Sequence, residues 1–500
     1  MPGLLVLLAW AALLLSLALA LRNRRRNALI AKLPGPWLFV PLAGNMLELI
    51  VQVIWLKGDL VELGTKNVRK YGPIFRLWSG HQPVVLISGP EDAEVVLTHP
   101  AVADKGQNYK LLSSWLGDGI LLAGGAKWHS RRKMLSPAFS VRVLEQFVAL
   151  FNKHCAILED KMLALAGGPP FDITPFMSLF ALDVISETSM GVQIHAQTQE
   201  DSEYVRAVKT ACRCFLVRQV FPWLRSDTLL ALTATGKSLS EATGVLRGMT
   251  TKVIDQRTSE VASSVSSSQP EEEDDIGLKQ RAVLLDHMLT LRGRGITDED
   301  ITDEVSTFMF AGHDTTMTAL CFTLHLLSLH RGVQERVFQE VRDVVGDSGP
   351  VTAQHLNDLK YLECVIKEVL RLYPSVPVIV RDCKQEFDLP SGYTIPVGSQ
   401  VGIDIFHLHR NPAVFPRPLE FDPDRFLEGG PAHRFGYLPF SASQRNCIGQ
   451  RFAMMEMKTV LARLVRSFRI LPPSDDYRLQ LKIEIVLGAQ GGYLVALERR

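Results

Sequence analysis

The sequence is short of several features that would point directly to a function. Its 54 Lys and Arg residues are balanced by 53 Asp and Glu residues, so the net charge of +1 lacks the basic excess of a nucleic-acid-binding protein. Seven cysteines in 500 residues, odd in number and widely scattered, exclude a secreted disulfide scaffold. No C-x-x-C pair, C-x-x-C-H haem-attachment motif or H-E-x-x-H zinc motif occurs. Six of the cysteines are therefore expected to be small core residues, and only Cys447 has a distinctive setting.

Long uncharged runs are also scarce, and the one at the amino end predicts a membrane anchor. Residues 4–21 carry no charge and are long enough for one membrane-spanning helix. Four arginines follow the run: Arg22, Arg24, Arg25 and Arg26. A secretory signal carries its positive charge before the apolar run, so we expect an uncleaved anchor with the body in the cytosol, although Ala18-Leu19-Ala20 resembles a cleavage site.

The rest of the chain has the composition of a folded globular protein, with 47% hydrophobic and 21% charged residues. We divide it into an anchor at 1–21, a basic stop and proline-rich hinge at 22–37, and a single domain at 38–500. Short β-rich pieces near 74–78 and 84–87 are followed by long stretches of helical periodicity, which predicts a mainly α fold with small β-sheets. A serine-rich and acidic stretch predicts a flexible loop at 259–280.

Two long helices carry polar groups at positions that a buried helix would normally fill with apolar side chains. The first is predicted from a capping box at Thr297 to about Leu329, and it contains Ala311-Gly312-His313-Asp314-Thr315-Thr316. These residues either bond back to the helix at a kink, or Gly312 makes room for a ligand while Asp314 and Thr315 supply protons and a hydroxyl. The second helix is predicted at 352–372 and contains Glu368 and Arg371, which alone could be a routine surface pair.

The segment Phe440-Ser-Ala-Ser-Gln-Arg-Asn-Cys447-Ile-Gly449 precedes another predicted helix. A cysteine beside an arginine and ahead of a helix N-terminus is placed where the thiolate is favoured, although in isolation a buried, inert cysteine is the better interpretation.

Together, in this order and spacing, these motifs resemble the cytochrome P450 haem-thiolate monooxygenases, from about residue 33 to the carboxyl end. The resemblance implies the P450 fold, a triangular helical prism, behind one N-terminal transmembrane helix. It implies haem b as cofactor with Cys447 as the axial thiolate ligand of the iron. The other cofactor-binding positions that match are Trp128, Arg132, Arg381, Phe440, Arg445 and Gly449. Glu368, Arg371 and Arg425 match the family's buried ion triad.

The resemblance also assigns the polar groups of the central helix. Asp314 and Thr315 match the acid and alcohol that deliver protons to the oxygen chemistry at the haem. The motifs around Phe308, Trp128 and Arg445 look like family 4, the fatty-acid ω-hydroxylase branch. Many family 4 members esterify the haem through a glutamate at position 311, where this chain has Ala311, so the haem is not expected to be covalently bound. The usual first glycine of the cysteine loop is Ser443, which predicts strain in the loop or a weaker hold on the haem.

The expected function is hydroxylation of a hydrophobic, lipid-like substrate with O2, most simply a fatty acid at or near its terminal carbon. The partners implied are NADPH–cytochrome P450 reductase, cytochrome b5 and membrane lipid, and the implied location is the cytosolic face of the endoplasmic reticulum. Arg131 and Lys133, on either side of Arg132, are expected to present positive charge to the reductase. The apolar segments at 376–380 and 221–224 would equally admit terpenoid hormones or xenobiotics. A reductase-independent enzyme that rearranges peroxides and a haem sensor or carrier are the remaining alternatives.

Overall fold

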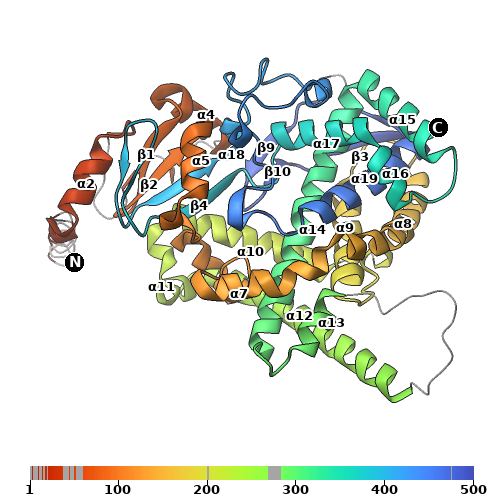
Figure 1. Cartoon of the computed structure of the whole chain (residues 1–500), viewed down its shortest axis with the longest axis horizontal. Coiled ribbons are helices and arrows are strands. Elements are labelled where there is room, and N and C mark those ends of the chain that lie inside the picture. The colour runs from red at the N-terminus through yellow and green to blue at the C-terminus, as the bar shows by residue number, and fades with distance from the viewer. Residues whose placement is uncertain are drawn as a thin grey trace.

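The computed structural model describes residues 3, 10, 14, 17–19, 21–37, 44–45, 50–51, 60–199, 202–267, 283–474 and 476–500. Helices make up most of this part of the chain, and the sheets are small, as predicted (Figure 1). The longer helices are α7 (Gly125–Leu135), α8 (Val141–Leu163), α9 (Thr174–Ser189), α10 (Glu203–Val220), α12 (Ala234–Ser267), α14 (Asp298–Leu329), α15 (Arg331–Val345), α17 (Lys360–Leu372) and α19 (Gln450–Ser467). The shorter ones are α2 (Arg24–Ala31), α4 (Leu60–Tyr71), α5 (Pro90–Thr98), α6 (Ser113–Leu116), α11 (Asp227–Ala231), α13 (Leu284–Thr290), α16 (Ala353–Asp358) and α18 (Ile405–Leu408).

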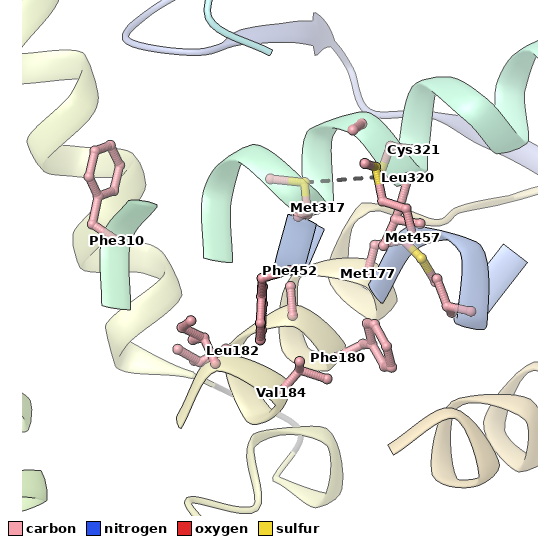
Figure 2. Packing of buried hydrophobic residues seen from close by; sticks show 14 of the residues in the cluster. Met177, Phe180, Leu182, Val184, Phe310, Met317, Leu320, Cys321, Phe452 and Met457 are labelled. Atoms are coloured by element: carbon pink, nitrogen blue, oxygen red, sulfur yellow. Dashed lines mark hydrogen bonds between the residues drawn. The ribbon is translucent and has the colours of Figure 1, made fainter. Parts of the chain in front are cut away.

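Helix α14 crosses the middle of the molecule and is buried along most of its length (Figure 1). It begins with the predicted capping box, in which the Thr297 hydroxyl and the Asp300 carboxylate each accept a backbone N–H at 3.1 Å. Figure 2 shows the apolar core where α14 meets α9 and α19, with Met317 of α14, Phe180 of α9 and Phe452 of α19. This packing holds α14 in place between α9 and α19.

Four strands form the largest sheet, in the order β1-β2-β7-β4. The strands are β1 (Ile74–Ser79), β2 (Gln82–Ile87), β7 (Gln400–Asp404) and β4 (Val378–Asp382). The β2–β7 pair is parallel and the other two pairs are antiparallel. The smaller sheets consist of β3 (Phe171–Asp172), β11 (Leu494–Arg499) and β8 (Phe468–Leu471); of β9 (Gln480–Ile483) and β10 (Leu487–Gln490); and of β5 (Phe387–Asp388) and β6 (Thr394–Ile395). The large sheet has its own apolar core, separate from the helical one.

The proline-rich hinge packs against this sheet. Ile30 and Leu33 are almost fully buried in the sheet's core, and Arg25 forms a 2.7 Å ion pair with Glu386. Most of the predicted anchor lies outside the described residues. Within the described part of the chain, no single helix is long and apolar enough to cross a membrane, although α7 with its short extension to Phe139 and α8 reach the limit as a pair bent by 59°.

Two predicted boundaries are wrong. The loop expected from 259 begins later, because α12 continues to Ser267, and residues 268–282 lie outside the described residues. The single helix expected at 352–372 is two helices, α16 and α17, that meet at Leu359. The carboxylate of Glu340 in α15 accepts the N–H groups of Tyr361 and Leu362 at 2.6 and 2.8 Å and so caps the start of α17.

Candidate active site

Cys447 lies between a short 3-10 turn and the N-terminus of α19, on a loop closed by its own backbone. Its N–H donates to the carbonyl oxygen of Phe440 at 2.9 Å. The other six cysteines are buried as predicted, whereas the Cys447 side chain is exposed. A Cβ on Gly449 would stand 4.0 Å from both the Cys447 sulfur and the Phe139 ring, so the chain leaves room beside the sulfur.

The protein alone does not favour the Cys447 thiolate, contrary to the interpretation of its sequence neighbours. Desolvation by the surrounding protein raises the pKa of the thiol, and it outweighs the N–H of Gly449 and the charges of Arg132 and Lys105, which lower it. A metal ion bound to the sulfur would favour the thiolate, because a coordinating thiol loses its proton.

Cationic side chains gather around Cys447 in excess of carboxylates. They are Lys105, Arg132, Arg381 and Arg445. The nearby carboxylate of Asp104 already accepts from Lys384 and from the N–H of Gly125. Burial and mutual repulsion lower the pKa of Arg445 to about 10, and lower the pKa of Lys105 well below its usual value.

Two of these guanidinium groups keep a donor free. Arg381 is 2% exposed, and its Nη2 has no hydrogen-bond partner within the described structure. Arg445 donates to the carbonyl oxygens of Ala103 and Ala123 at 3.2 and 2.6 Å, and its Nη1 is also without a partner there. Buried donors of this kind cost free energy unless an acceptor meets them, so the cluster fits the carboxylate groups of an anionic ligand.

Helix α7 contributes to the same region. Arg132 donates to the backbone and side-chain oxygens of Asn446 at 2.8 and 2.7 Å and thereby fixes the residue before Cys447. The guanidinium of Arg445 stacks over the Trp128 ring at 4.4 Å. The structure thus brings together the cofactor-binding residues predicted from the sequence, which are Trp128, Arg132, Arg381, Phe440, Arg445, Cys447 and Gly449. It adds Lys105, which pairs with Arg381 across a β-bridge and belongs to no local sequence motif.

The polar stretch of α14 contains both a hydroxyl that bonds back to the helix and an acid that can supply a proton. The Thr315 hydroxyl donates to the carbonyl oxygen of Ala311 at 2.8 Å, and the Ser375 hydroxyl donates to that of Thr315 at 2.9 Å. Asp314 is 7% exposed, and desolvation, with the charge of Glu484, raises its pKa to about 7. Asp314 is therefore partly protonated at neutral pH and can release a proton.

Gly312 does not make room for a ligand, which corrects that hypothesis. A Cβ at Gly312 would stand 2.5 Å from the Ile185 side chain of α9, so the glycine lets α9 and α14 approach each other. His313 is also structural, since its ring shares a 2.8 Å hydrogen bond with Ser178 of α9.

Glu368, Arg371 and Arg425 form a buried brace rather than a surface pair. The Glu368 carboxylate accepts from Arg371 at 2.7 and 2.8 Å and from Arg425 at 3.0 Å. Arg371 also donates to three carbonyl oxygens of the segment that precedes the cysteine loop. The triad ties α17 to that segment.

Arg131 does not face outward, so the prediction that it presents charge to a reductase is wrong. Arg131 is 6% exposed, and its guanidinium forms a 2.5 Å ion pair with Asp300 at the start of α14. Lys133 is exposed as expected. The helix turns about 100° per residue, and α14 covers the side on which Arg131 lies.

Comparison with known proteins decides what this arrangement is. The cytochrome P450 family model matches residues 34–495. The chain belongs to the cytochrome P450 family. It is 41% identical to probable cytochrome P450 4s3 of Drosophila melanogaster over 93% of this chain and 92% of that protein, and 40% identical to cytochrome P450 4d2 of the same species over 100% and 99%. It is 37% identical to human cytochrome P450 4V2 over 92% and 90%.

The protein is thus a P450 monooxygenase, which uses haem b with a cysteine thiolate axial ligand, O2, a hydrophobic substrate and a redox partner. When bound, the haem supplies the activation of oxygen. Cys447 would provide the iron ligand, and Arg381 and Arg445 have the free donors to hold the propionates. Asp314 can hold and release a proton at neutral pH, and the Thr315 hydroxyl is oriented by the Ala311 carbonyl.

Proposed function

We propose that this P450 hydroxylates a long-chain fatty acid at or near its terminal carbon, with the haem not esterified to the protein. The observation that carries the substrate class is the segment that faces Thr315. Ser375 is bonded to the Thr315 carbonyl oxygen, and the residues that follow into β4 are apolar and only partly buried at Val376 and Val378. These partly buried valines offer apolar surface directly after the residue that contacts α14, and the relatives are named as members of family 4, the branch whose motifs the sequence resembles.

The position of attack follows from Ala311. A methyl side chain cannot form an ester, so the haem has no covalent tether to α14 at this position. Terminal hydroxylation requires that the methyl group be held closer than the more reactive methylenes, and each tenfold in product ratio takes about 1.4 kcal/mol of positioning. We expect terminal alcohol with appreciable in-chain product.

The test uses the holoenzyme with NADPH–cytochrome P450 reductase, phospholipid and a series of saturated fatty acids of increasing length, with products separated by chromatography. Oxidation of the fatty acids that depends on NADPH and is lost in Cys447→Ser supports the proposal. No oxidation across the series would move the substrate to a ring-bearing lipid or xenobiotic. Haem that resists extraction by acidified organic solvent would contradict the absence of an ester.

The same proposal places the protein on the cytosolic face of the endoplasmic reticulum, held by residues 4–21, with electrons from the reductase and cytochrome b5 as a second donor. Support comes from the four arginines after the apolar run and from Ile30 of α2, which is buried in the apolar core of the large sheet. Microsomes from expressing cells should retain the protein after alkaline extraction, and protease added outside should degrade its body. Release into the soluble fraction would contradict the anchor.

A further inference from the structure

Two consecutive acids of α14, Asp303 and Glu304, hold a loop to which no role has yet been assigned. The Asp303 carboxylate accepts the N–H of Asp118 at 2.7 Å, and the Glu304 carboxylate accepts the N–H of Ile120 at 3.0 Å. Both acceptors are side chains of the central helix, and both donors belong to the 117–123 loop, which follows α6. The loop is therefore attached to α14 through alternate backbone N–H groups.

The loop fits against α14 only because its contact positions lack side chains. Gly117 has a φ of +57°, and a Cβ there would overlap the Asp303 carboxylate. A Cβ on Gly119 would stand 2.5 Å from the Thr307 hydroxyl and 2.8 Å from the Asp303 carbonyl oxygen. Gly117 and Gly119 alternate with the bonded N–H groups of Asp118 and Ile120. This alternation fixes both the distance of the loop from α14 and the position of the loop along the helix.

Packing alone does not explain the two acids. Asp303 is 4% exposed and Glu304 is fully buried, and an apolar side chain would avoid the cost of burying a carboxylate. Their second oxygens have no hydrogen-bond partner in the described structure and face Arg247 and Arg131 at 3.8 Å. What the acids contribute is acceptors for backbone N–H groups that would otherwise be buried unpaired.

Both ends of the loop reach the active site. At its far end, the carbonyl oxygen of Ala123 accepts a 2.6 Å hydrogen bond from Arg445, one of the guanidinium groups with a free donor. Just before the loop, the Trp115 ring packs on Phe310 with 4.6 Å between centroids. Phe310 directly precedes Ala311. A change in the distance of the loop from α14 would therefore move Arg445 at one end of the loop and Phe310 of α14 at the other.

We propose that Asp303 and Glu304 are positioning residues that hold the 117–123 loop between Arg445 and Phe310 of α14, and that the position of this loop influences which carbon of the substrate is hydroxylated. This inference rests on the proposed function for the identity of the substrate. The loop's attachment is a property of the chain that can be measured without any substrate.

The first arm compares Glu304→Met with Glu304→Gln in the holoenzyme. Methionine has a similar length but no acceptor for the Ile120 N–H, whereas glutamine keeps an oxygen there. Glu299→Met changes an exposed acid of the same helix and serves as the control. A carbon monoxide difference spectrum of the thiolate type establishes that each variant has folded around its haem.

The second arm leaves the buried charges intact. Gly119→Ala should lift the loop through its contact with Thr307, and Gly248→Ala, where a Cβ meets nothing within 4 Å, is the matched control. This pair keeps the proposal testable if removal of the Glu304 carboxylate prevents folding.

Hydrogen exchange of the loop amides is the direct readout. Exchange in Glu304→Met and Gly119→Ala should be about three- to tenfold faster than in wild type, as expected for the loss of one hydrogen bond. Both should also shift the ratio of terminal to in-chain alcohol by about threefold or more and raise KM more than they lower kcat, with Glu304→Gln close to wild type.

Unchanged exchange in both Met and Ala variants would overturn the attachment. Faster exchange with an unchanged product ratio would show that the loop does not position the substrate. If wild type oxidises no fatty acid, the proposed function fails, and the exchange measurement still decides whether the two acids hold the loop.

Discussion

The N–H of Cys447 donates a 2.9 Å hydrogen bond to the carbonyl oxygen of Phe440, and this bond closes a loop that contains two serines in the left-handed region. Ser443 has a φ of +61° and Ser441 a φ of +58°. A residue with a Cβ pays about 1–2 kcal/mol in this region, which glycine does not. The strain predicted from the missing glycine is thus present, and it lies directly beside the axial cysteine.

Ser443→Gly should therefore raise the free energy of unfolding by about 1 kcal/mol, less the entropy that glycine gains in the unfolded chain. Thermal unfolding and the rate of haem transfer to an acceptor protein measure the effect. Ala442→Gly is the control, because Ala442 has an extended φ of −148° and should only lose stability. Equal changes in the two variants would show that Ser443 is not strained.

The second prediction concerns the cysteines. Cys447→Ser should abolish both the thiolate-type carbon monoxide spectrum and turnover, whereas Cys364→Ser and Cys383→Ser should retain both. The latter two side chains are buried and therefore not accessible to a metal ion, whereas the Cys447 side chain is exposed. A thiolate spectrum that persists in Cys447→Ser would remove the axial ligand from this position.

Local patterns in the sequence were sufficient for the elements whose causes are local. The capping box at Thr297 and Asp300 marks the start of α14 because both partners lie within one turn. The break at Leu359 depends on Glu340, about twenty residues away, and the face of Arg131 depends on where α14 packs. Sequence periodicity says which residues share a helix face but not what lies against it.

The active site also contains features that local sequence predicts and features that depend on residues distant in the sequence. The spacing of Trp128 and Arg132 predicts one helix face, and both indeed lie in the cluster around Cys447. No local pattern indicates that Ile185 lies against Gly312, and none indicates a role for Lys105, because its bridge partner comes from a distant strand. The net effect on the Cys447 pKa likewise required the desolvation that surrounds the sulfur.

The third prediction is a pH dependence from Asp314. Its pKa is raised from 3.8 to about 7, so the folded protein binds the proton more tightly than the unfolded chain does. This group's contribution to stability is present in full below the unfolded value and is lost as pH rises through about 7. Asp314→Asn should therefore flatten the loss of stability between about pH 4 and 7 in urea unfolding of the holoprotein.

Product yield should also depend on the protonation of Asp314 and should fall as the pH rises. Above about pH 7 Asp314 is mostly ionised and has no proton to give, so product formed per NADPH should fall on the alkaline side in wild type. In Asp314→Asn the yield should be low and independent of pH. An alkaline decline that persists in the variant would assign it to another group.

The fourth prediction separates the two contacts of Thr315. Its hydroxyl proton is donated to the Ala311 carbonyl oxygen, which leaves the hydroxyl oxygen free to accept. Thr315→Ala should leave haem content and substrate binding intact but release more hydrogen peroxide per NADPH, whereas Thr315→Ser should stay close to wild type. Equal product yield per NADPH in all three proteins would remove the hydroxyl from the mechanism.

The last prediction distinguishes Lys133 from Arg131, two cations on the same helix with opposite surroundings. Lys133 is exposed, so Lys133→Glu should slow reduction by the reductase at low salt, and less so at high salt, without changing stability. Arg131 is buried against Asp300 and Glu304, so Arg131→Met should leave the buried Glu304 carboxylate without its cation and Asp300 with Lys127 alone, and lower the free energy of unfolding by about 3 kcal/mol. Stopped-flow reduction over a salt series and denaturant unfolding measure the two effects. If Lys133→Glu slows reduction equally at all salt concentrations, or not at all, α7 is not the face on which the redox partner docks.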